Sequence, residues 1–217
     1  MKSEPREVRT PALAGIACFV AVSFVALFRL GRLGPLDFWW WLGLNVLLAA
    51  GLSFAADTGY PASLAADLKS GFARKAGLGL ACAAVLYAVF AAGRLAALKI
   101  FPFAASGIAS IYCLRSQAGP ARIALLLGLL IGPGEEIVWR GFLQEHLGRK
   151  VGRTMGLVLT AGAYALVHAG SGNVMLVLAA GVCGVFWGMT YRLFRSPLVN
   201  IVSHTVWAVG IFLVAPL

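Results

Sequence analysis

Seven long apolar stretches constrain this chain more than any other feature of its sequence. They can be drawn at about 11–30, 36–56, 76–93, 121–147, 154–170, 173–191 and 197–216, and most come close to the roughly 20 residues that a helix needs to cross a bilayer. Apolar residues make up 60% of the chain and charged residues only 12%, which leaves little room for a soluble domain. Because a helix satisfies its own backbone hydrogen bonds in lipid, the pattern predicts an all-α, polytopic bundle of about seven transmembrane spans.

The net charge of +10 is scattered over the ends of these stretches and forms neither a basic stripe nor a nucleic-acid recognition motif. We therefore expect membrane lipids, and no nucleic acid, among the partners. Eleven basic residues fall on the N-terminal side, namely Lys2, Arg6, Arg9, Lys69, Arg74, Lys75, Arg149, Lys150, Arg153, Arg192 and Arg195. Six fall on the opposite side, namely Arg29, Arg32, Arg94, Lys99, Arg115 and Arg122. This excess predicts a multi-pass protein of the cell's inner (plasma) membrane with a cytoplasmic N-terminus.

The segment 94–120 is apolar in part but is interrupted by Lys99, Pro102 and Gly107. If it crossed the membrane fully, Lys and Arg would divide eight to eight between the two sides, and the charge bias would vanish. We therefore interpret it as an interfacial or re-entrant segment. The chain then divides into 1–120, with N-terminal transmembrane helices and the interfacial segment, and 121–217.

Three ionisable residues lie within the apolar stretch 121–147, in the run EEIVWR at positions 135–140. A charge near the bilayer centre costs roughly 2.5–3.5 kcal/mol, so these side chains must face one another or a wet cavity. On a helix, Glu136 and Arg140 share a face and can pair, whereas Glu135 points about 100° away and has no local partner. Glu135 is therefore the candidate general base.

Two further features support a polar site at this depth. Gly132-Pro133-Gly134 predicts an interruption of the helix, and freed backbone groups are tolerated only beside a cavity or buried protein. His168 and His204 fall inside later stretches, and a rise of 1.5 Å per residue places them roughly 21 and 12 Å from the cytoplasmic end, against roughly 20 Å for Glu135. The three can meet in one layer. His146 lies nearer that end, and we interpret it as an interfacial residue.

These residues also carry a resemblance to a known family. EEIVWR matches the EExxxR signature of the CPBP glutamic intramembrane proteases, a group with CAAX-processing, bacteriocin-processing and ABI-type members. Tyr164 to His168 resembles the family's FxxxH motif, and His204 stands where its HxxxN motif begins. The similarity covers about 121–217, which would be the catalytic helix core. Two positions differ, because Tyr164 replaces phenylalanine and Ala208 replaces the final asparagine. Asn200, one turn before His204, could supply a replacement amide.

The resemblance implies hydrolysis of a peptide bond by a glutamate-activated water, without a cofactor. Glu135 would be the base, His168 would orient the water and His204 would donate to the oxyanion. Supporting roles would fall to Glu136, Arg140, Asn200 and Tyr164. The alternative is Zn²⁺ held by Glu135, His168 and His204 with an open fourth position, although HExxH is absent.

The expected substrate is the C-terminal tail of a membrane-anchored protein, either a sorting signal or a CAAX-like tail. Two other classes remain open. A non-catalytic membrane immunity or scaffold protein would keep the fold without needing Glu135, and Ala208 favours that alternative. A small transporter would also place carboxylates and histidines within the membrane, but it would ordinarily show paired repeats, which this sequence lacks.

Overall fold

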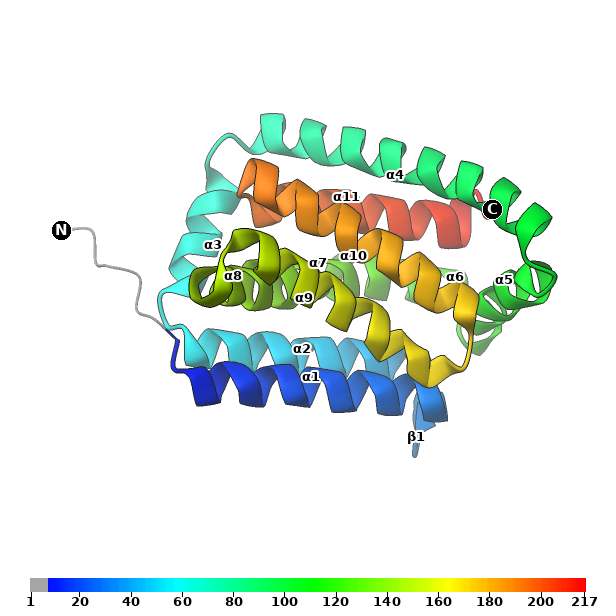
Figure 1. Ribbon diagram of the computed structural model, residues 1–217, viewed down its shortest axis with the longest axis horizontal. Coiled ribbons are helices and arrows are strands. Elements are labelled where there is room, and N and C mark those ends of the chain that lie inside the picture. The colour runs from blue at the N-terminus through cyan, green and yellow to red at the C-terminus, as the bar shows by residue number, and fades with distance from the viewer. Residues whose placement is uncertain (1–7) are drawn as a thin grey trace.

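The computed structural model describes residues 8–217, which are almost entirely helical (Figure 1). The α-helices are α1 (Thr10–Leu30), α2 (Phe38–Ala56), α3 (Tyr60–Lys69), α4 (Phe72–Ile100), α5 (Ala104–Tyr112), α6 (Pro120–Leu126), α7 (Gly132–Glu136), α8 (Glu145–Val151), α9 (Arg153–Val167), α10 (Val174–Phe194) and α11 (Pro197–Val209). Within this part of the chain, the only strands are β1 (Arg32–Leu33) and β2 (Leu36–Asp37), which form a short antiparallel hairpin. The predicted all-α polytopic bundle is confirmed.

Five helices are long and apolar enough to cross a membrane: α1, α2, α4, α10, and α11 with its extension to Val214. Their outer faces expose large apolar side chains, such as Val22 at 63% and Leu193 at 69%. Such a surface is stable only against lipid. The two other predicted spans correspond to α9 with a 3₁₀ turn at His168–Ser171 and to a segmented helix over 120–151. The count of seven spans stays a prediction.

Local sequence explains where several helices begin and end. α1 ends at Gly31, which adopts φ 71° and donates its N–H to the carbonyl of Leu27. At the start of α2, the Asp37 carboxylate accepts the N–H groups of Trp39 and Trp40. α11 begins after Ser196, whose hydroxyl accepts the N–H of Val199.

The segment 94–120 differs in part from its prediction. Residues 94–100 continue α4, because Arg94 and Lys99 are good helix formers and do not interrupt it. The helix ends at Ile100, and its C-cap residue Phe101 stands directly before Pro102. The rest folds into the nine-residue helix α5 and a 3₁₀ turn at Cys113–Gln117, which lie at one end of the bundle (Figure 1).

The segmented helix over 120–151 lies in the middle of the bundle. It contacts α2, α9, α10 and α11, while α1 packs on α2 and α4 packs on α11 (Figure 1). Buried residues from 1–120 and from 121–217 join in one apolar core, in which Phe24 of α1 meets Trp139 edge to face. The division at residue 120 therefore remains a proposal about function. Lys2 and Arg6, two of the predicted cytoplasmic charges, lie outside the described residues.

Candidate active site

The helix that carries the two glutamates does not break at Gly132-Pro133-Gly134 as predicted. Instead, it stays helical and changes to wider π-helical turns at Leu127–Ile131 and at Ile137–Gln144, on either side of α7. The N–H of Gly132 bonds to the carbonyl of Leu127, five residues back. A π turn of this kind gives the chain room at Pro133, which supplies no N–H of its own. Such turns frequently mark functional sites.

Glycines and one tyrosine hold this segment against its neighbours. A Cβ at Gly134 would overlap Val46 of α2, and a Cβ at Gly132 would lie 2.8 Å from the hydroxyl of Thr205 on α11. The hydroxyl of Tyr60 on α3 donates to the carbonyl of Ile137 at 2.9 Å. Burial raises the pKa of Tyr60 well above its usual range, so this hydroxyl stays protonated and able to donate.

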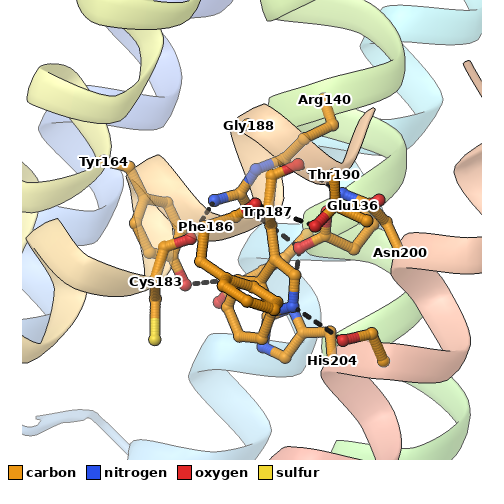
Figure 2. A network of polar contacts seen from close by, with 12 residues as sticks. Glu136, Arg140, Tyr164, Cys183, Phe186, Trp187, Gly188, Thr190, Asn200 and His204 are labelled. Carbon is orange, nitrogen blue, oxygen red and sulfur yellow. Dashed lines mark hydrogen bonds and ion pairs between the residues drawn. The ribbon is translucent and has the colours of Figure 1, made fainter. Parts of the chain in front are cut away.

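Glu136 is fully buried, and both of its carboxylate oxygens are occupied (Figure 2). Oε1 accepts from Arg140 Nη1 at 2.7 Å and lies 2.8 Å from His204 Nδ1. Oε2 accepts from Asn200 Nδ2 at 3.0 Å. The predicted pairing of Glu136 with Arg140 is present. With three donors around it, this carboxylate has the environment of a fixed negative charge.

Two aromatic rings contact the guanidinium of Arg140. The group lies 4.6 Å from the ring centroid of Tyr164 and 5.3 Å from that of Trp187, both within the range of a cation–π contact. Its second nitrogen, Nη2, donates to the carbonyl of Cys183 at 3.4 Å. A buried cation is therefore stabilised by one carboxylate, one carbonyl and two aromatic faces.

Glu135 has a different environment from its neighbour. Its Oε2 accepts a hydrogen bond from the Tyr164 hydroxyl at 2.7 Å, while no hydrogen bond to Oε1 is formed by residues 8–217. The side chain is buried, at 6% exposure. The hydroxyl that distinguishes Tyr164 from the family's phenylalanine therefore donates its hydrogen bond to the candidate base, Glu135.

His168 lies one turn after Tyr164, where α9 passes into a 3₁₀ turn. Its Nδ1 lies 2.7 Å from the carbonyl oxygen of Tyr164. Because a carbonyl only accepts, Nδ1 carries the proton, and Nε2 of the neutral ring is left as an acceptor. Phe28 of α1 packs on the imidazole with ring centroids 4.5 Å apart and further restricts the ring.

His204 on α11 is fixed by Glu136 and by Trp187. Its ring stacks on the indole of Trp187 at a centroid distance of 3.8 Å and an interplanar angle of 19°. The indole Nε1 in turn donates to Ser203 at 3.2 Å. Because the Glu136 carboxylate holds Nδ1, the second nitrogen, Nε2, which forms no hydrogen bond with residues 8–217, can face a substrate. Nothing in the sequence marks Trp187, because an aromatic residue in an apolar span ordinarily only packs.

Asn200 shares a face of α11 with His204, as its spacing predicts, but its amide is already engaged. Nδ2 donates to Glu136 and, at 2.8 Å, to the carbonyl of Trp187, and the residue is fully buried. Its Oδ1 has no partner among the described residues. Ala208, which replaces the family's asparagine, is buried and offers no donor.

The remaining ligand candidates do not form a metal centre. Within the described part of the chain, no three His, Cys, Asp or Glu side chains lie close enough to hold a metal ion. The donor set named for Zn²⁺ therefore does not fit as arranged. His146 is not part of this cluster. Its Nε2 lies 3.2 Å from the carboxylate of Asp57, near the end of the bundle.

Comparison with known proteins identifies one family model that matches part of this chain. Residues 117–210 match the family model described as type II CAAX prenyl endopeptidase Rce1-like. This part of the chain is similar to that family, the CPBP family. No curated protein and no solved structure matches it at a significant level. The Rce1-like region covers all three motifs and leaves out residues 1–116, so α1 and its Phe28 were found only through the fold.

As Rce1-like proteins, family members are CAAX-type intramembrane proteases, and peptide-bond hydrolysis is the activity of the family. The multi-pass, apolar helix bundle agrees with a membrane protein that acts on a membrane-anchored substrate. In this Rce1-like chain, the EExxxR, FxxxH and HxxxN positions come from three different parts of the bundle. The polar contacts around Glu136 and Tyr164 bring them together.

Proposed function

We propose that this Rce1-like chain is an endopeptidase that cleaves membrane-anchored protein tails with a water activated by Glu135. The single observation that carries the proposal is the contrast between two adjacent glutamates. Glu136 has both oxygens occupied by three donors, whereas Glu135 has one oxygen held by Tyr164 and the other without a protein partner among the described residues. A general base needs an oxygen that can take a proton, and only Glu135 offers one.

His168 supports this reaction through its tautomer. With Nδ1–H donating to the Tyr164 carbonyl, Nε2 can accept a hydrogen bond from the attacking water and orient it. The contact uses the carbonyl of the same residue whose hydroxyl holds Glu135. Tyr164 therefore fixes the positions of both groups that would handle the water.

His204 would stabilise the oxyanion of the tetrahedral intermediate. Glu136 holds the ring at Nδ1, so a proton on Nε2 would point toward the developing charge and could donate to it. Stacking on Trp187 keeps the ring in one orientation. Glu136, Arg140 and Asn200 act on this group as positioning residues. No serine or cysteine nucleophile and no metal ion takes part in these steps.

The proposed substrate is the C-terminal tail of a membrane-anchored protein, with a sorting signal ranked ahead of a prenylated CAAX-like tail. The support comes from the location of the site. It lies inside a bundle whose outer face is apolar, which agrees with a scissile bond that is held in the membrane region. The protein would act in the inner (plasma) membrane, with the arginine-rich end of the bundle in the cytoplasm.

The test is cleavage in vesicles that contain the purified protein and a reporter with either type of tail. Glu135→Gln should abolish cleavage and leave thermal unfolding close to that of the wild type. Asp57→Asn is the matched control, because it makes the same change from carboxylate to amide near the end of the bundle, where Asp57 pairs with His146. The control should cleave at nearly the wild-type rate. Mass spectrometry of the products would identify the bond.

Two results would contradict the proposal. Full cleavage by Glu135→Gln would show that Glu135 is not the base. It would favour the alternative, a non-catalytic immunity or scaffold protein. Cleavage of neither tail by the wild type, together with uptake of a small solute into the vesicles, would favour the transporter.

A further inference from the structure

A hollow lined mainly by arginines lies where α8 ends, α9 begins and α10 ends. Figure 1 shows these three helix ends at the same end of the bundle. Its volume is about 330 Å³. The lining residues are Gln144, Glu145, Gly148, Arg149, Arg153, Arg192 and Arg195. Four guanidinium groups thus converge on one space that contains a single carboxylate. Charges that serve only to orient a membrane protein need not converge in this way.

The single carboxylate does not neutralise the arginines around it. Glu145 pairs with Arg195 at 2.6 Å and with Arg149 at 3.2 Å. Arg192 donates to the hydroxyl of Thr154 at 2.9 Å, and Arg153 makes no hydrogen bond or ion pair with residues 8–217. Two of the four arginines therefore have no acidic partner within the described residues, and the hollow keeps a surplus of positive charge.

The start of α9 adds to this positive field. α9 is 15 residues long and begins at Arg153, and no side chain in the described residues caps its first turn. The aligned peptide dipoles place partial positive charge at that end. The turn before it is tightly built, because a Cβ at Gly156 would lie 2.6 Å from the Cα of Gly148, and Gly152 adopts φ 89°. The arginines are thus mounted on a compact turn.

The helices that carry these arginines also expose apolar side chains. On α9, Met155 and Val158 are 50% and 54% exposed, and on α10 Met189 and Leu193 are 41% and 69% exposed. A phosphate ligand with acyl chains would gain from both the hollow and this apolar surface. A free phosphate ion would gain from the hollow alone.

We propose that the arginine hollow binds the phosphate group of an anionic phospholipid at the membrane surface. Guanidinium groups recognise phosphate oxygens with paired, charge-assisted hydrogen bonds, and basic pockets at the ends of transmembrane helices suit lipid headgroups. Arg153 and Arg192 are the principal contacts, because Arg149 and Arg195 also hold Glu145. The proposed site is separate from the protease site and does not depend on the proposed function.

The experiment measures retained lipid by native mass spectrometry of the full chain released from nanodiscs. The nanodiscs contain phosphatidylcholine with phosphatidylglycerol as the anionic probe. The test variant is Arg153→Gln/Arg192→Gln, which leaves Glu145 with both of its arginine partners. The control is Lys69→Gln/Arg74→Gln, which removes two exposed charges from the same end of the bundle outside the hollow. Thermal unfolding in phosphatidylcholine alone verifies that both variants fold.

The wild type and the control should retain phosphatidylglycerol in preference to phosphatidylcholine. The test variant should lose roughly tenfold or more in affinity, the effect of deleting charge-assisted hydrogen bonds. Equal retention by the test variant and the control would overturn the proposal. So would displacement of the lipid by millimolar inorganic phosphate, because the hollow would then be a site for the free ion. A second variant, Arg153→Lys/Arg192→Lys, keeps the charge and should retain more lipid than the glutamine variant.

Discussion

The buried pair of Glu136 and Arg140 predicts a strong and specific effect on stability. In Glu136→Gln, the guanidinium of Arg140 would remain 1% exposed and lose its only carboxylate partner within the described residues. Orphaning one partner of a buried ion pair costs about 3–5 kcal/mol of unfolding free energy. Glu135→Gln breaks no ion pair, and weakens one hydrogen bond to Tyr164, so its cost should be about 1 kcal/mol.

A double-mutant cycle separates the pair from its surroundings. Arg140→Met leaves Glu136 with His204 and Asn200 as its remaining donors, and should cost nearly as much as Glu136→Gln. The double variant Glu136→Gln/Arg140→Met has no orphaned charge. Its loss should therefore be smaller than the sum of the two single losses, with a coupling energy of about 1–3 kcal/mol.

The measurement is equilibrium unfolding in mixed micelles, with the mole fraction of sodium dodecyl sulfate as the denaturant and tryptophan fluorescence as the signal. Glu145→Gln is the matched control, because Glu145 also pairs with arginines, which are 37% and 41% exposed. Its loss should be about 0–1 kcal/mol. The reasoning fails if Glu136→Gln is no less stable than Glu135→Gln, or if the losses of the two single variants simply add.

Three further predictions concern activity. Tyr164→Phe restores the family's residue and keeps the ring over Arg140, so it should retain cleavage within roughly tenfold of wild type; complete loss would make the hydroxyl essential. Asn200→Ala should lower turnover by roughly 10–10³ and, since it removes a buried donor to Glu136, should also lower stability. Ala208→Asn in that background should restore part of the turnover but not the stability. A metal assay by mass spectrometry should find well under one equivalent of Zn²⁺ in the purified active protein, which should stay active after prolonged chelation. Activity that is lost when Zn²⁺ is removed and recovered when Zn²⁺ is added back would reverse the metal-free assignment.

Much of the architecture follows from local patterns in the sequence. The length and apolarity of the stretches predicted helices that the structure confirms, including α1, α2 and α10 close to their predicted bounds. The spacing of four between Glu136 and Arg140 predicted their pairing, since both lie on one helix. The resemblance to the family followed from three short motifs and is confirmed by the match over 117–210. Helix bounds and the pairing of Glu136 with Arg140 depend on residues less than two helical turns apart, and the motifs are short patterns that were already known.

Only the tertiary structure decided which side chains of the site contact one another. The hydrogen bond from Tyr164 to Glu135 joins residues 29 positions apart, and the contact of His204 with Glu136 joins residues 68 positions apart. Helical periodicity assigns a residue to a face, but it does not say which helix packs against that face. For the same reason, the engagement of Asn200 by Glu136 and the stacking of Trp187 on His204 could not be predicted. Periodicity likewise did not predict the π turns on either side of α7, a segment that packs so closely on α2 and α11 that a Cβ at Gly134 would overlap Val46 and one at Gly132 would lie 2.8 Å from the hydroxyl of Thr205.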